Sequence, residues 1–470
     1  MDKFLETAKQ KGYKVGELTL GQSIDLATEL HQSIGEVVIS EAMAAQKASR
    51  EEITTAIDDA FKHNLHALEI GLTSGSSFIM GTVGSELTGI SLHGDPFVDK
   101  VLHYTLAAQV GNHAVGLNPC AGTGDACTLT GLVRAVIETV TDEAQRTRLL
   151  ALMLKIGTIF RAGKKTTGCN MEGFGAGASA TAAVISEMLG GTPEQTGKAI
   201  VLALSPTIGV PCTPRVMVAG LCATHIGGGV LIGSLAANLA VKTSIPLTVP
   251  VDVMISLAAA VHPVSAQHIV PVVIHYMEPF FKTNDAVEEY IAPEVKAQKA
   301  ERIDKTITAA SKEAQILAGK ANSIIKPLGD SAVVGGSSQA VGSPTNAARI
   351  AHALAQGEIT GVKIELYPEL FARRGINIPG ILMAALYGCN TDDAKMYREI
   401  MDRVREAGIK VEIVEGDEAQ LQRITIYATK QNAMVDSLNR GGARLVLRKA
   451  EPSLEEAQQA AKELHIDVVN

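Results

Sequence analysis

The sequence predicts a multidomain protein in which a large, mainly helical domain precedes a smaller α/β (α+β) domain. Its 470 residues are more than one ordinary hydrophobic core accommodates, so two or three domains are expected. Apolar residues recur at helical spacing through the first 290 residues, whereas helical and strand patterns alternate after about residue 335. We therefore expect a mainly helical domain over 1–290, a helical connector over 291–325 and a small α/β domain over 326–470.

The first domain is predicted to consist of helices separated by irregular segments. Ser49 marks a typical helix start, because a serine cap is followed by Glu51 and Glu52 and then by apolar residues at helical spacing. Helical segments are predicted, in order, over 18–63, 96–115, 126–159, 178–189 and 193–204. The irregular segments are rich in glycine or proline and lie at 73–95, 117–125, 161–177 and 205–215. Loops placed by a rigid scaffold are where binding residues tend to lie.

The second domain is predicted from a change of pattern beyond the charged segment 287–320, which is typical of a solvated helix or connector. Residues 332–343 are small and flexible. Helices are predicted over 346–356, 392–407 and 453–464. Strands are predicted over 361–367, 409–414, 422–427 and 443–447, the last two separated by the turn Asn439-Arg440-Gly441-Gly442.

Composition and charge exclude several classes of protein. The net charge is -8, aromatic residues are 4% and tryptophan is absent, so a broad nucleic-acid surface or a base-stacking platform is not expected. The N-terminus is charged from its second residue and has no apolar signal segment. Six cysteines in this length do not form a disulfide framework. We expect a reduced, cytoplasmic protein that binds no nucleic acid.

Residues 216–241 carry no formal charge and are long enough to span a bilayer. A membrane span is one interpretation. The run Gly227-Gly228-Gly229 weakens any helix, and Cys222, His225 and Asn238 are polar or reactive. We interpret the stretch as central helices of a large soluble core, and expect no membrane contact.

Three cysteines of the first domain are candidate metal ligands. Cys169 and Cys212 lie in predicted loops beside glycine or proline, and Cys222 follows Cys212 by ten positions. Thiolates are soft donors that suit iron–sulfur clusters or zinc, but no closely spaced cysteine pair is present for a zinc ribbon. Buried free thiols are the alternative, and spacing alone does not decide between them. Cys127 and Cys389 are interpreted as core residues, and the role of Cys120 is open.

At these residues the sequence resembles the iron–sulfur-dependent bacterial L-serine dehydratases. Gly168-Cys169-Asn170-Met171-Glu172-Gly173 is similar to the family's Gly-Cys-Gln-x-Glu-x-Gly segment. Leu189-Gly190-Gly191-Thr192-Pro193-Glu194-Gln195 matches a Leu-Gly-Gly-Ser/Thr-Pro-Glu-Gln segment closely. Cys212 and Cys222 look like the family's other two cluster cysteines, one residue closer together. The loop from Pro119 to Asp125 is similar to the family's Pro-Thr-x-Gly-Ser-Ala-Gly loop.

The resemblance extends to the second domain, although the domain order is the reverse of the familiar single-chain enzymes. Residues 362–367 and 436–442 look like the family's first strand and its glycine-rich strand pair. One departure concerns the expected active site. The family's Ser-Ser-Ser-His-Thr motif, whose histidine is a candidate base, is absent, and its histidine position falls on Gln339 or Ser343. The resemblance therefore implies the fold and the cluster, whereas the substrate and the base are left open.

The resemblance implies a [4Fe–4S] cluster on Cys169, Cys212 and Cys222, with one iron that lacks a cysteine ligand. Such an iron acts as a Lewis acid on a substrate hydroxyl while a base removes the proton α to a carboxylate. β-Elimination from a hydroxy-amino acid gives an enamine, which hydrolyses to a keto acid and ammonia. No motif demands pyridoxal phosphate.

The remaining roles are assigned to nearby polar residues. Candidate catalytic residues are Lys164, Lys165, His225 and Ser343. Candidate substrate-binding residues are Cys120, Gly122, Thr123, Gly124, Asp125 and Glu172. A solvated surface is the alternative for the lysine pair, and a hydrogen-bonded core position is the alternative for His225. His113 and His262 are interpreted as structural.

The leading hypothesis is a lyase acting on a small hydroxy-amino acid such as L-serine. The alternatives are a related hydro-lyase or desulfidase acting on another small acid, a non-catalytic sensor of a small acid on the same scaffold, and a plain soluble protein without metal. We also expect a homodimer, because the apolar helical domain exceeds what one small domain can cover.

Overall fold

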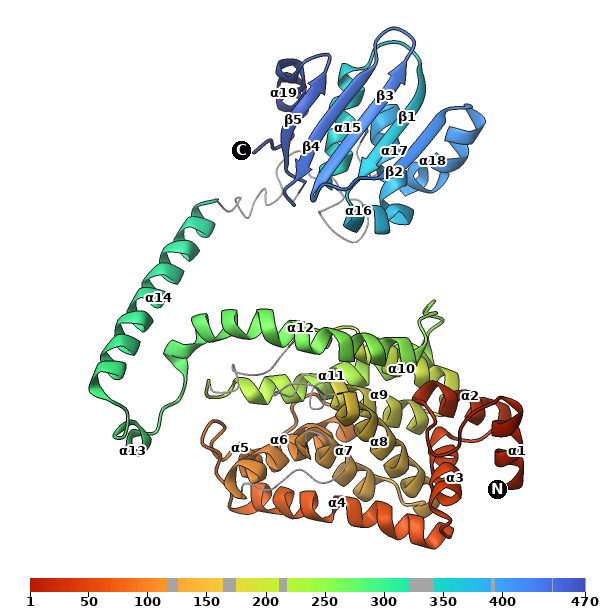
Figure 1. The fold of residues 1–470 in the computed structure, drawn as a ribbon, viewed down its shortest axis with the longest axis vertical. Coiled ribbons are helices and arrows are strands. Elements are labelled where there is room, and N and C mark those ends of the chain that lie inside the picture. The colour runs from red at the N-terminus through yellow and green to blue at the C-terminus, as the bar shows by residue number, and fades with distance from the viewer. Residues whose placement is uncertain are drawn as a thin grey trace. The chain divides into compact units, whose positions relative to one another are not determined.

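The fold was analysed in a computed structural model, which describes residues 1–115, 126–163, 175–210, 218–320, 342–389, 394–441 and 443–469. The chain divides into two compact units, Met1–Lys312 and Glu313–Asn470. The first unit is helical and the second contains a five-stranded sheet (Figure 1). The predicted fold class, a large mainly helical part followed by a smaller α/β part, is therefore confirmed.

Several helices of the first unit begin directly after a capping residue. Thr19, Ser49 and Thr192 each accept a hydrogen bond from the third residue of their helix, whose side chain bonds back to the cap. In order, the helices are α1 (Asp2–Gln10), α2 (Leu20–Leu30), α3 (Ile34–Gln46), α4 (Arg50–Thr73), α5 (Val83–Glu86), α6 (Pro96–Val115), α7 (Ala126–Thr139), α8 (Glu143–Gly163), α9 (Gly177–Met188), α10 (Pro193–Leu204), α11 (Leu221–Lys242), α12 (Val251–Met277) and α13 (Asp285–Glu288), with a short 3₁₀ turn at Glu278–Phe280. Helix α14 (Pro293–Lys320) follows and extends past Lys312, the last residue of the first unit.

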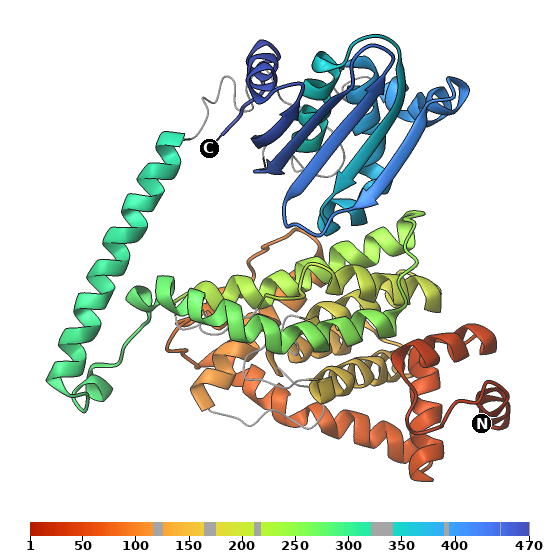
Figure 2. The same cartoon turned by 45° about the horizontal axis from the view of Figure 1, so that its top comes forward.

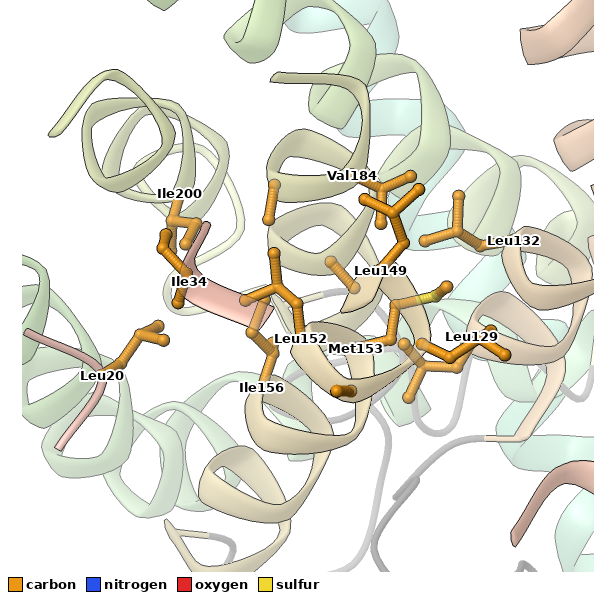
Figure 3. Close-up of a cluster of buried hydrophobic side chains, with 14 of the residues drawn as sticks. Leu20, Ile34, Leu129, Leu132, Leu149, Leu152, Met153, Ile156, Val184 and Ile200 are labelled. Atoms are coloured by element: carbon orange, nitrogen blue, oxygen red, sulfur yellow. The ribbon is translucent and has the colours of Figure 1, made fainter. Parts of the chain in front are cut away.

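Helix α8 supplies the centre of the hydrophobic core. Its Leu149, Leu152, Met153 and Ile156 lie among side chains from α2, α3, α7, α9 and α10 (Figure 3). The side chains of all four residues are fully buried. The sequence predicted one helical segment over 126–159, but α7 and α8 are separate helices. Asp142 explains the break, because its carboxylate accepts the backbone N–H groups of Ala144 and Gln145 at the start of α8.

Glycines allow α4 and α6 to pack closely. A Cβ at Gly71 would collide with the carbonyl oxygen of Ala107, and a Cβ at Gly111 with that of Ala67. Gly233 of α11 is similarly close to the backbone at Ala178 of α9. These contacts bring helix backbones together and fix the relative positions of the helices that surround the candidate site.

Two helices of the first unit, Leu221–Lys242 and the stretch Val251–Phe280, are long and apolar enough to cross a membrane by length and composition. Half of the most apolar window of the first is buried inside the protein, as is typical of a core helix. The corresponding window of the second is only 17% buried. The interpretation of residues 216–241 as part of a core therefore fits α11, and α12 keeps an exposed apolar face.

The second unit is a five-stranded mixed sheet in the order β2-β1-β3-β4-β5. Only the β1–β2 pair is parallel. Helices α15 and α17 lie behind one face of the sheet (Figure 2). The elements are α15 (Gly342–Leu354), β1 (Ile359–Leu366), α16 (Pro368–Ala372), α17 (Arg374–Tyr387), α18 (Ala394–Glu406), β2 (Lys410–Glu415), β3 (Leu421–Ala428), β4 (Ala433–Asn439), β5 (Leu445–Glu451) and α19 (Leu454–Glu463).

Strand β4 was not predicted from its own residue pattern, although residues 436–442 resemble the family's glycine-rich strand pair. Its residues include Asp436, Ser437 and Asn439, which are unfavourable in strands when judged by propensity alone. The structure compensates for them: Asp436 pairs with Arg423 of β3, and Ser437 accepts a hydrogen bond from Gln422. Cross-strand partners thus make a polar segment into a central strand.

Candidate functional site

The structure describes three of the predicted site residues, namely Cys222, His225 and Ser343. The other predicted residues lie outside the described ranges and remain predictions: Cys120, Gly122, Thr123, Gly124, Asp125, Lys164, Lys165, Cys169, Glu172 and Cys212. Gln339 also lies outside them. Over the residues that the structure does describe, no three His, Cys, Asp or Glu side chains gather closely enough to hold a metal ion.

Several helices that flank the predicted loops have their termini close together in the bundle. Thr128 in the first turn of α7 packs against Gly177, the first residue of α9. Gln109 near the end of α6 reaches Cys222 in the first turn of α11. Helices α6 and α7 pack together, as do α9 and α11. Among the described residues, the last turns of α6 therefore lie at the start of α11, and the start of α7 lies at the start of α9.

Cys222 lies at the start of α11, and its side chain is directed into the protein. The residue is 2% exposed and packs with Leu106 and Val110 of α6. Its Sγ accepts a hydrogen bond from Nε2 of Gln109 at 3.6 Å. The N-terminus of a helix and an N–H donor both stabilise a thiolate, which is the form that binds metal. The chemistry at Cys222 therefore fits a metal-ligating cysteine, the one part of a cluster site that the described residues can test.

Gln109 belongs to a chain of hydrogen bonds that runs away from Cys222. Its Nε2 lies 2.8 Å from Nε2 of His113, and Nδ1 of His113 lies 2.6 Å from Oγ of Ser77. Ser77 Oγ also accepts the backbone N–H groups of Ile79 and Met80, at 3.3 Å and 3.1 Å. Helices α6 and α11 and the loop that carries Ser77 are thus joined by one network of hydrogen bonds at Cys222, the predicted metal ligand.

The loop that carries Ser77 is itself tied to the start of α11. Ser77 and Gly81 form an isolated bridge, and Gly81 takes a positive φ of 60° that favours glycine. The carbonyl oxygen of Ile79 accepts the N–H of Gly220 at 2.9 Å, directly before α11. The backbone of this loop therefore holds both the hydrogen-bond network and the helix that presents Cys222.

His225 lies one turn after Cys222 and lines a cavity between α11 and α12. The cavity has a volume of about 640 Å³. Its lining is mostly apolar and consists of Val210, Leu221, Thr224, His225, Val272, Val273, Tyr276 and Met277. His225 is buried, with 7% of its surface exposed. Cys222 is not among the lining residues, so the described structure places the histidine and the thiol in different surroundings.

Ser343 lies in the second unit, at the N-terminus of α15, inside a buried polar cluster. Its Oγ accepts a hydrogen bond from Nε2 of Gln422 at 2.7 Å, and the same nitrogen donates to Ser437 at 3.1 Å. Asn346 donates to the carbonyl oxygen of Ala443 at 3.0 Å and accepts from Arg349 at 3.1 Å. Ser343, Asn346 and Gln422 are fully buried. The described contacts make Ser343 part of a packed polar cluster at a helix N-terminus.

No residue pattern in the sequence indicates that Ser77, Gln109 and His113 contribute to this region. Ser77 and Cys222 are distant in the sequence, and glutamine and serine follow no recognisable spacing here. Sequence analysis assigned His113 a structural role. A periodicity argument places His113 on the same face of α6 as Gln109, four residues earlier, but it does not identify the helix that this face contacts.

Comparison with known proteins gives two matches. The profile of the family described as "Serine dehydratase alpha chain" matches residues 29–270. The chain is also 28% identical over 255 residues to the protein of Bacillus subtilis (strain 168) named "Probable L-serine dehydratase, alpha chain". That alignment covers 49% of this chain and 82% of the relative. The profile match contains all three candidate cluster cysteines, together with Gln109 and His113.

Proposed function

Since the chain belongs to the serine dehydratase alpha chain family, we propose that it is a [4Fe–4S]-dependent lyase. The reaction is β-elimination of water from a small hydroxy-amino acid such as L-serine, which gives an enamine that is hydrolysed by water to a keto acid and ammonia. Family membership suggests a lyase in general terms. The cluster, the substrate and the residues that act on it are our proposal.

The proposal depends most on the environment of Cys222. It lies inside the range that matches the family, it is buried, and its sulfur accepts an N–H from Gln109. Cys169 and Cys212 precede α9 and α11 in the sequence, and these two helices pack against each other. We propose that these three cysteines hold the cluster, and that the protein leaves one iron without a cysteine ligand.

A bound cluster of this kind supplies an open iron position that withdraws charge from a departing hydroxyl group. The chain must provide the rest. We propose that the small-residue loop Cys120–Asp125 and Glu172 bind the substrate, with backbone N–H groups directed at its carboxylate. Lys164 or Lys165 is the proposed proton acceptor, which requires desolvation of the ammonium group. His225 and Ser343 remain candidates for proton transfer.

Anaerobic reconstitution tests the proposal. The protein is loaded with iron and sulfide and assayed for keto acid and ammonia with L-serine, L-threonine, L-cysteine and small hydroxy acids. We expect turnover of at least one compound, together with a change in the cluster's electron paramagnetic resonance spectrum when that compound binds. No turnover and no spectral change with any of them contradicts the proposal.

A second candidate function is favoured by one sequence observation. The family's Ser-Ser-Ser-His-Thr motif is absent from residues 335–346, and Ser343 is bound to Gln422 in a buried cluster. A protein that kept the scaffold and lost the base binds a small acid without converting it. Tight binding of such an acid to the loaded protein, measured by calorimetry and without product formation, supports this sensor function over the lyase.

We propose that the protein is a cytoplasmic homodimer with no nucleic-acid partner. Its net charge of -8 does not favour binding to phosphate backbones. The exposed apolar face of α12 supports the dimer, because Val253, Leu257 and Val264 are between 45% and 56% exposed. A second copy of the chain is the occupant that we propose for this face.

A further inference from the structure

The amide of Gln109 lies between a predicted metal ligand and an imidazole. Its Nε2 contacts the sulfur of Cys222 at 3.6 Å and Nε2 of His113 at 2.8 Å. An amide nitrogen carries two hydrogens and has no lone pair to accept a bond. Both contacts are therefore donated by Gln109, one to sulfur and one to the ring nitrogen.

With the Gln109 amide in this orientation, the contact at Nε2 determines the tautomer of a neutral His113. Because Nε2 of the ring accepts from Gln109, a neutral His113 carries its proton on Nδ1. That proton is directed at Oγ of Ser77, 2.6 Å away. Ser77 thereby holds the ring, and the ring selects which end of the Gln109 amide faces it. With the amide reversed, its oxygen rather than its nitrogen would face Cys222.

We propose that Gln109 is a positioning residue for the iron–sulfur cluster and that His113, held by Ser77, keeps its amide nitrogen directed at the Cys222 thiolate. The inference rests on the proposed function, because it assumes that Cys222 is a cluster ligand. The three residues do not touch substrate. They act by stabilising the negative charge on one ligand sulfur.

The energetic argument follows from the charge of the ligand. A hydrogen bond to an ionised group is stronger than one between neutral groups, and the site at Cys222 is shielded from water. Residues that donate hydrogen bonds to metal ligands commonly contribute 10–100-fold to metal affinity. Hydrogen bonds to cluster sulfurs also raise the reduction potential, because reduction adds negative charge that the donors stabilise.

The first test compares Gln109→Leu and Gln109→Glu with the wild-type protein after anaerobic reconstitution. Leucine removes the donor at similar volume, and glutamate directs an acceptor at the thiolate. We expect iron loss to a chelator to become roughly 10–100-fold faster in Gln109→Leu. The midpoint potential of the cluster falls in both variants, further in Gln109→Glu. Gln298→Glu, at an exposed position on α14, is the matched control and leaves both values unchanged.

The second test separates the role of His113 from simple packing. His113→Leu is expected to produce a smaller change in the same direction, because the Gln109 amide can then turn. If His113 acts through Gln109, the double variant Gln109→Leu/His113→Leu loses iron no faster than Gln109→Leu alone. The thermal midpoint of the metal-free proteins shows whether either substitution merely loosens the fold.

The outcomes distinguish the two levels of the argument. Wild-type protein that binds no cluster overturns the proposed function, and this inference with it. Wild-type protein that binds a cluster, with unchanged potential and iron loss in the Gln109 variants, overturns the inference alone. Additive effects of the Gln109 and His113 substitutions contradict the part assigned to His113. If Gln109→Glu does not fold, His113→Leu and Ser77→Ala provide the same comparison of potentials.

Discussion

At the scale of single residues, Glu187 on α9 has an unusual environment for a carboxylate. Burial raises its pKa from 4.5 to about 7, and the backbone N–H groups of Ile34 and Gly35 and the charge of Arg148 only partly oppose this. Among the described residues, its Oε1 has no hydrogen-bond partner. The folded protein therefore holds a proton on Glu187 at pH values where the unfolded chain has lost it.

This residue predicts how stability depends on pH. Because the folded-state pKa is raised, the associated stability is fully present below pH 4.5 and is lost as the pH rises towards 7. The loss is on the order of 3 kcal/mol at most. Glu187→Gln should remove this loss of stability. The variant should therefore be more stable than wild type at pH 8 but no more stable at pH 4.5. Urea unfolding at both pH values measures this, with exposed Glu51→Gln as control. Equal pH dependence in wild type and Glu187→Gln contradicts the assignment.

Asp436 on β4 joins two arginines across the sheet. Its Oδ2 accepts hydrogen bonds from Nε and Nη2 of Arg423 at 3.0 Å and 2.6 Å, and Arg448 lies 3.6 Å from Oδ1. The carboxylate is 6% exposed, but the Arg423 side chain is 37% exposed, so water weakens the pair.

Asp436→Asn should cost about 1–3 kcal/mol of unfolding free energy. Asp402→Asn, which removes a surface ion pair with Arg405, should cost less than 1 kcal/mol. Equal losses of unfolding free energy in the two variants would show that the burial of Asp436 does not strengthen its ion pairs.

Single residues differ in how far the sequence identifies them. Cys222 is identified as a candidate ligand by its spacing from Cys212 and by the motif around Cys169. Gln109 and His113 are not, because their importance depends on which helix faces α6, and that is decided by packing. A residue that acts through a neighbour in space has no signature in its own sequence surroundings.

At the scale of elements, the close approach of α4 and α6 depends on glycine. A Cβ at Gly71 would collide with the backbone of Ala107, which cannot move without displacing α6. Gly71→Ala should therefore lower the unfolding free energy by roughly 1–3 kcal/mol, despite the better helix propensity of alanine. Gly319 on α14 has no atoms near a would-be Cβ, so Gly319→Ala should stabilise by about 0.5–1 kcal/mol. Stabilisation by both substitutions would contradict the packing argument.

Elements were predictable where local signals are strong. Helix α6 spans the predicted residues 96–115, and strands β1, β2 and β3 lie within a few residues of their predicted ranges. The residue pattern of β4 did not indicate a strand, because its polar residues find partners only in the assembled sheet. The division between α7 and α8 was missed, although Asp142, which accepts two N–H groups at the start of α8, is a typical helix cap.

At the scale of the whole molecule, the apolar face of α12 tests the proposed dimer. Leu257 and Val264 are exposed, and no charged residue lies between Asp252 and Glu278. Light scattering after size exclusion should give a dimer, and Leu257→Glu/Val264→Glu should give a monomer. Val295→Glu, at an exposed position on α14, is the control and keeps the dimer. A wild-type monomer contradicts the proposal, and recovery only in detergent would assign the face to a membrane instead.

The division into a helical part and a smaller α/β part was predictable from periodicity, because the pattern changes along the chain. The arrangement of the candidate ligands was not. Of the three cysteines only Cys222 lies among the described residues, and its contact with Gln109 depends on the packing of α11 against α6, which sequence spacing does not record.

The central claim is that Cys169, Cys212 and Cys222 hold an iron–sulfur cluster, and iron and acid-labile sulfide analysis after anaerobic purification tests it most directly. We predict about four iron and four sulfide per chain in the wild type, and loss of most of both in Cys169→Ser, Cys212→Ser and Cys222→Ser. Cys389→Ser, whose half-buried thiol contacts Met383 and Met396 in the second unit, should keep the wild-type content. Wild-type protein without iron, or Cys222→Ser protein with full iron and an unchanged spectrum, would contradict the claim.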